Sequence, residues 1–182
     1  GVADPTVRHV GIENLSGDSE FLSPEDEDHG WTFVTMVSAR DSWVRNVTST
    51  HFGYACVDVG SGSRAITVSD CTCLDPVSKI TGGRRYSFAL DGQLTLVLRC
   101  HARNGRHDYV MHSLAAGPNA FVDCTAELAH SDSGPHHRWS VGVLYDNIRE
   151  SGAKDTLGSG AINIVNRGSK GTGHGWSGAN QV

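Results

Sequence analysis

Basic side chains alternate with aromatic ones in several short stretches of this chain. Successive side chains of a β-strand point to opposite faces, so the rings would point inward and their neighbours outward. The outward set comprises His51, Arg85, Arg106, Asp108, His136 and Arg138. Guanidinium groups on strands ~4.8 Å apart would match the carboxylates of a polyanion. The alternation therefore predicts a face that binds an acidic polymer.

The same side chains could also perform a reaction. β-Elimination from a uronic acid requires a neutralised carboxylate and a base that removes the adjacent proton. His136 would be that base. Arg106 and Arg138 would neutralise the carboxylate, and Asp108 would orient an arginine or the histidine. The predicted catalytic residues are His136, Arg106, Arg138 and Asp108, and the predicted substrate-binding residues are Arg85, His51 and Asp132. The favoured function is a polysaccharide lyase that acts on an acidic polysaccharide.

Three other interpretations remain open for this face. The charges could simply solvate the exposed side of a sheet. Glycoside hydrolysis would need two carboxyl groups about 5–10 Å apart, and Asp108 with Asp132 is the pair that could meet. A glycan-binding module, such as a tailspike segment or an adhesin, would use the same charges without catalysis.

Recurring phrases indicate the elements that must position these residues. Rings recur two residues apart, as in Phe52-Gly53-Tyr54 and Tyr86-Ser87-Phe88, and a second phrase of the type Val68-Ser69-Asp70-Cys71 keeps step with them. The rings expected to point inward are Phe52, Tyr54, Tyr86, Phe88, His107, Tyr109, His137, Trp139, His174 and Trp176. Such periods, about 20–50 residues, are typical of repeat architectures.

Composition favours strands and turns and excludes some partners. The chain has 22 glycines in 182 residues and lacks long helical stripes. No apolar run could span a bilayer, and a net charge of −5 argues against nucleic acid. We expect a secreted or periplasmic protein whose partner is a polysaccharide, with no nucleic-acid or membrane partner.

The two recurring phrases together resemble those of right-handed parallel β-helix proteins of the pectate-lyase-like superfamily. The stretches Gly105–Tyr109 and Ser133–Trp139 resemble uncharacterised bacterial members. The resemblance implies an all-β solenoid of about six coils, with residues 1–182 forming a single β-helix segment of a longer chain. Its uncapped ends would then allow self-association or contact with a partner chain.

The cysteines and histidines of this chain could bind a metal ion, but packing in the core explains their positions more simply. Cys71, Cys100 and Cys124 occupy equivalent positions, which predicts a buried column of free thiols. The inward histidines would stack in the core, and adjacent His136 and His137 could not ligate one ion from a regular strand. We therefore expect no metal site and no cofactor. The acidic stretch from residue 18 to 28 is where Ca²⁺ could bind, although a solvated loop is favoured.

Overall fold

The computed structural model describes residues 6–152, 161–168 and 174–175. Within these ranges the chain forms strands joined by turns and no helix. Consequently, no described segment is a helix long and apolar enough to cross a membrane. The predicted inward ring of Trp176 lies outside the described residues.

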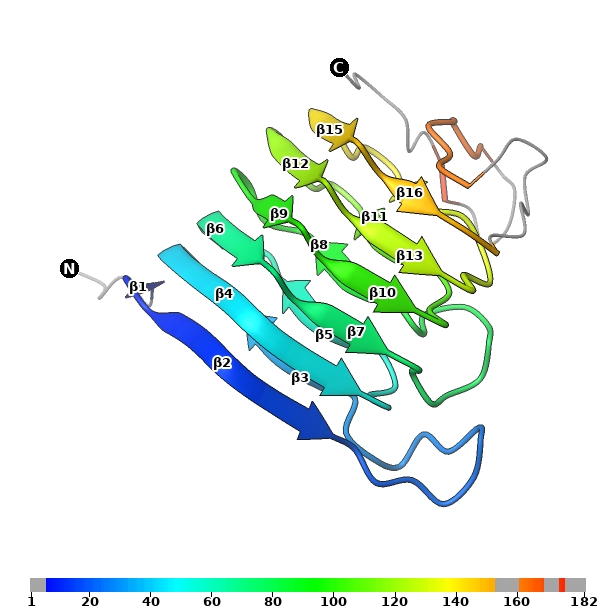
Figure 1. Cartoon of the computed structure of the whole chain (residues 1–182). Helices are drawn as coiled ribbons and strands as arrows, with labels where there is room; N and C mark the ends of the chain where they lie inside the picture. The colour runs from blue at the N-terminus through cyan, green and yellow to red at the C-terminus, as the bar shows by residue number, and fades with distance from the viewer. Residues whose placement is uncertain (1–5, 153–160, 169–173, 176–182) are drawn as a thin grey trace.

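The strands form two sheets, which lie one behind the other in Figure 1. The eleven-stranded sheet contains β1 (Val7–Arg8), β2 (Gly11–Asp18), β4 (Ala39–Thr50), β6 (Arg64–Ser69), β7 (Thr72–Leu74), β9 (Leu96–Leu98), β10 (His101–Arg103), β12 (Asn119–Val122), β13 (Thr125–Glu127), β15 (Val143–Asp146) and β16 (Arg149–Glu150). The five-stranded sheet contains β3 (Thr32–Met36), β5 (Ala55–Val59), β8 (Phe88–Leu90), β11 (Tyr109–Met111) and β14 (Gly134–Pro135). Strand pairing is parallel in both sheets, as in β11 against β8 and β10 against β13.

The second recurring phrase marks a sharp bend in the eleven-stranded sheet. Its third residue adopts a left-handed conformation, with φ of 51° at Asn46, 56° at Asp70 and 53° at Asp123. Asparagine and aspartate tolerate this conformation better than most residues, which explains their recurrence there. The bend separates β6 from β7 and β12 from β13, while β4 continues through it and pairs with both β6 and β7.

The core lies along the inner side of both sheets. Phe88 and Tyr109 stack with ring centroids 5.6 Å apart and are almost fully buried. Cys71, Cys100 and Cys124 are buried free thiols, and the Cys100 thiol donates to the backbone carbonyls of Val68 and Leu98. The predicted column of free interior thiols is therefore confirmed.

The predicted fold class, a right-handed β-helix of about six coils, is contradicted. The observed arrangement is two open parallel sheets of eleven and five strands, and neither closes on itself. The prediction treated each recurring phrase as one complete strand of a uniform coil. In the structure a left-handed bend divides several of these strands, and β4 belongs to two ladders at once.

The predicted register of the ring phrases is wrong beyond Tyr109. Val110 pairs with Gly134, which places Tyr109 beside Ser133 and leaves Trp139 well past the end of β14. The side chain of Trp139 is accordingly 53% exposed instead of buried. Matching rings by their spacing failed here because the strand opposite Tyr109 carries no ring.

Candidate functional site

A cavity of about 640 Å³ lies on the face of the five-stranded sheet that points away from the main core. Alternation along β8 and β11 buries Phe88 and Tyr109 in the core and turns Ala89 and Val110 to this other face, where they pack with Tyr86 and Tyr54. The cavity is lined by Tyr54, Thr81, Gly82, Gly83, Tyr86, Arg106, His112, His136, His137 and His174. Aromatic rings, imidazoles and one guanidinium therefore share a single hollow.

Two of the imidazoles owe their position to strand ends. His112 directly follows β11 and His136 directly follows β14, and the backbone N–H of His136 donates to the carbonyl of Met111 at 2.9 Å. Parallel strands end at the same edge of a sheet, so residues that follow them gather there. This edge places both rings beside the tyrosines.

Tyr54 and His112 form a hydrogen-bonded pair at the cavity wall. The Tyr54 hydroxyl lies 2.8 Å from Nε2 of His112. Burial, followed by the negative charge of Asp58, raises the pKa of Tyr54 above its usual range. Burial also lowers the pKa of His112, while the Asp58 carboxylate opposes that change. The pair therefore rests as a neutral phenol and a neutral imidazole, with a carboxylate that would stabilise an imidazolium.

Arg106 supplies the guanidinium that lines this cavity. Its backbone is fixed beside the preceding strand connection, because the N–H of Arg106 donates to the carbonyl of Arg85 at 2.8 Å. Its Nη1 is buried and has no hydrogen-bond partner among the described residues. A buried donor without a partner carries a desolvation cost that an anionic ligand would relieve.

Three imidazoles meet at the other part of the wall. One ring nitrogen from each of His136, His137 and His174 lies within 4.8 Å of the others. His137 and His174 stack with centroids 4.5 Å apart, and the Tyr86 hydroxyl lies 3.2 Å from Nε2 of His136. Burial, followed by the positive charge of His174, lowers the pKa of His137 to about 4. These three residues form a group that could hold a metal ion.

The structure brings together two of the predicted site residues, Arg106 and His136. It places His136 on the cavity wall as a largely buried ring, so the prediction of an exposed ladder is wrong for this residue. Arg138 is exposed and does not line the cavity.

Three other predicted site residues are buried away from it, and for Arg85 and Asp108 the predicted outward orientation is therefore wrong. The Arg85 guanidinium donates to the carbonyl of Ser78 at 2.7 Å. Asp108 is fully buried and accepts a hydrogen bond from the Ser87 hydroxyl at 2.5 Å. Asp132 pairs with Arg167 at 2.5 Å, also in the interior. Their side chains bond to interior partners, although Oδ2 of Asp108 has no hydrogen-bond partner among the described residues.

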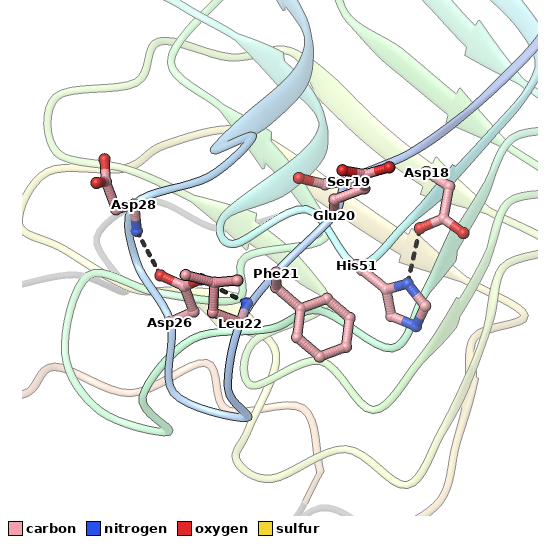
Figure 2. A pocket seen from close by; sticks show the side chains of 8 residues that line it. All are labelled: Asp18, Ser19, Glu20, Phe21, Leu22, Asp26, Asp28 and His51. Carbon is pink, nitrogen blue, oxygen red and sulfur yellow. Dashed lines mark hydrogen bonds and ion pairs between the residues drawn. The ribbon is translucent and has the colours of Figure 1, made fainter.

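His51 lies in a second hollow of about 720 Å³, at the acidic stretch. Figure 2 shows the carboxylates of Asp18, Asp26 and Asp28 pointing in different directions around Phe21. Asp26 accepts hydrogen bonds from the backbone of Leu22 and Asp28, and Asp18 pairs with His51 at 2.7 Å. The carboxylates therefore shape the loop and do not converge on the Ca²⁺ position considered from the sequence.

Sequence reasoning missed five of the lining residues that carry rings, or assigned them to the core. Tyr54, Tyr86, His137 and His174 were expected to point inward, and His112 was not singled out. The available signal was the place of His112, directly after the apolar run Tyr109–Met111. A polar residue at that position marks the edge of a parallel sheet, where sites in such sheets are commonly found.

Comparison with protein-family models, with curated proteins and with solved structures found no match. The resemblance to pectate-lyase-like proteins stays a prediction. The case for a function must therefore come from the cavity itself.

Proposed function

We propose that this protein cleaves an acidic polysaccharide by β-elimination in the cavity lined by Tyr54, Arg106 and His112. The observation that carries the proposal is the buried Nη1 of Arg106, which has no partner among the described residues, in the same cavity as a Tyr–His hydrogen bond. A uronic acid offers the two features these groups require: a carboxylate and an acidic proton on the adjacent carbon.

Arg106 would bind and neutralise the substrate carboxylate. Guanidinium groups can hold a carboxylate through two parallel hydrogen bonds, and the contact withdraws electron density from the ring. Neutralisation of the carboxylate makes the C5 proton easier to remove. Removal of this proton is the main barrier to elimination. The cavity wall excludes part of the solvent and strengthens this interaction.

Tyr54 would remove the C5 proton and protonate the leaving oxygen, and His112 would accept and return the proton of the Tyr54 hydroxyl. The raised pKa of Tyr54 disfavours a free tyrosinate, so Tyr54 needs a proton acceptor when it acts as a base. As Oη takes the C5 proton, its own proton passes to Nε2 of His112, 2.8 Å away. The C4–C5 double bond forms, the C4–O4 bond breaks, and the departing O4 takes a proton from Oη. His112 then returns its proton to Tyr54, and the charges balance.

Among the described residues, no carboxyl group lines this cavity, so the hydrolytic alternative has no matching pair there. Asp108 and Asp132, the pair considered from the sequence, are both buried and engaged with Ser87 and Arg167. Neither lines the cavity. A protein that only binds glycans would not need the Tyr54–His112 pair for catalysis, so this pair favours an enzyme over a binding module.

The test is a screen of the full chain against uronic-acid polymers, followed by ultraviolet absorbance of the unsaturated product. Elimination raises this absorbance, hydrolysis produces reducing ends without it, and a binder produces neither. With a substrate found, Arg106→Ala should lower kcat/KM about 10- to 100-fold, since hydrogen bonds to charged groups contribute roughly 1.5–3 kcal/mol. Arg138→Ala is the matched control and should retain full activity.

Reducing ends without ultraviolet absorbance would overturn the proposal. Equal loss of activity in Arg106→Ala and Arg138→Ala would also overturn the assignment of the cavity. Arg106→Lys should restore part of the rate, because an ammonium keeps the charge and loses the two-pronged geometry.

A further inference from the structure

The three histidines on the cavity wall come from two segments that are distant in sequence. His136 and His137 follow β14 directly, and His174 belongs to the short described segment 174–175. One ring nitrogen from each lies within 4.8 Å of the other two. Three imidazoles at this separation could surround one ion with modest side-chain adjustment, since zinc–nitrogen bonds are about 2.0–2.1 Å long.

Consecutive histidines can converge here because they lie outside the strand. β14 ends at Pro135, so the alternation of a regular strand no longer governs His136 and His137. Their ring centroids are 4.9 Å apart and their planes are inclined by 74°. The sequence-based objection to two adjacent ligands therefore does not apply.

The rings are held in place by neighbours. The Tyr86 hydroxyl lies 3.2 Å from Nε2 of His136. Next to His174, Gly168 and Gly175 exchange two backbone hydrogen bonds of 2.9 Å each, which join the segment 174–175 to the segment 161–168. Partners that orient a histidine ring are a regular feature of metal sites, and their loss typically weakens metal binding 10- to 100-fold.

The donor set indicates the class of ion. Three neutral imidazole nitrogens suit Zn²⁺ and related transition metals, whereas Ca²⁺ and Mg²⁺ prefer oxygen ligands. Among the described residues, no carboxylate or thiol belongs to this group of ligand atoms. We propose that His136, His137 and His174 bind one divalent transition-metal ion of the zinc class, with its fourth position open to the cavity.

This site stands independently of the proposed elimination reaction, which uses Tyr54, Arg106 and His112. Three protein ligands with an open fourth position are typical of zinc sites that bind water or substrate, whereas structural zinc sites have four protein ligands. A ligand carboxylate or hydroxyl in the cavity could fill that position.

The test measures metal binding directly, with full-length chain that carries no histidine tag and has been stripped with a chelator. Isothermal titration with Zn²⁺ should give one ion per chain. Co²⁺ should produce the visible absorption bands of a tetrahedral site. Saturation at about 100 times the dissociation constant should raise the melting temperature by roughly 5–10 °C.

His137→Ala is the informative variant, because its half-buried ring can be removed with less damage than the largely buried His136. We expect at least a roughly 10-fold loss of affinity and loss of the tetrahedral Co²⁺ bands. The matched control is His101→Ala, which removes a half-buried histidine from β10 in the other sheet. This control should bind Zn²⁺ as the parent does, and circular dichroism should show that both variants fold.

Two results would overturn the proposal: no stoichiometric binding to the folded parent, or equal affinity in the parent and His137→Ala. In either case the three rings would serve packing alone. Because binding and spectra are measured without substrate, neither result would affect the proposed elimination reaction.

Discussion

The hollow at the acidic stretch, of about 720 Å³, and the cavity on the five-stranded sheet, of about 640 Å³, use charge in opposite ways. At the acidic stretch, the carboxylates diverge: Asp26 accepts hydrogen bonds from the loop backbone, and Asp18 pairs with His51 (Figure 2). On the sheet, imidazoles and tyrosines converge, and the buried Nη1 of Arg106 has no partner among the described residues. Local abundance of charged residues therefore does not define a site; convergence and burial do.

The largest expected effect of this difference concerns Tyr54. Tyr54→Phe keeps the ring in the cavity and removes only the hydroxyl that bonds to His112. Loss of a general acid or base should lower kcat roughly 10²–10⁴-fold with a small change in KM. The measurement is steady-state kinetics on the polymer identified in the screen.

Tyr145→Phe provides the control, because the Tyr145 hydroxyl donates to the carbonyl of Tyr109 and does not line the cavity. It should leave kcat unchanged. If Tyr54→Phe retained the parent kcat, the Tyr54–His112 pair would have no part in the reaction. Convergence of side chains would then not identify the cavity on the five-stranded sheet as the functional site.

A smaller effect should appear in the pH dependence of stability. Burial raises the pKa of Asp108 to about 6, against the hydrogen bond from Ser87 that lowers it. The unfolded chain, with an aspartate pKa near ~3.9, then binds fewer protons than the folded protein between these values. Stability should therefore fall as pH rises from about 4 to about 6, by about 3 kcal/mol for this one group.

Asp108→Asn should remove this contribution, because an amide does not ionise. Denaturant unfolding of parent and variant at several pH values gives the difference directly, and the effects of the other carboxyl groups cancel in that difference. The parent should lose stability relative to the variant as pH rises from about 4 to about 6. Parallel stability curves would show that Asp108 is not a buried, weakly solvated acid.

Part of this structure follows from the sequence because local chemistry decides it. Asparagine and aspartate recur where the chain bends through left-handed φ, and cysteines recur where small buried side chains stack. Register across distant segments is different, because it depends on pairing that no single stretch encodes. Tyr109 meets Ser133 and not the ring of Trp139, and the spacing of aromatic residues cannot reveal this.

The candidate site was only half predictable for the same reason. Arg106 and His136 could be selected by residue type, since guanidinium and imidazole suit a carboxylate substrate. The partners of His136 could not be selected, because Tyr86 and His174 reach it from segments far away in sequence. Asp108 illustrates the converse error, since its type suits catalysis but its surroundings bury it.

The smallest effect is expected at the acidic stretch. Asp26→Asn removes the negative charge of a half-buried side chain and keeps only one of the two oxygens, so it can accept the hydrogen bond from either Leu22 or Asp28 but not both. Loss of one such hydrogen bond typically costs about 0.5–1.5 kcal/mol, so the melting temperature should fall by about 1–6 °C and kcat should be unchanged. The parent protein titrated with Ca²⁺ should show no saturable heat, because the carboxylates of this loop do not converge on one position. If the parent bound Ca²⁺ stoichiometrically and Asp26→Asn did not, the carboxylates of this loop would be able to converge on an ion. The contrast between diverging side chains in this hollow and converging side chains on the five-stranded sheet would then be wrong.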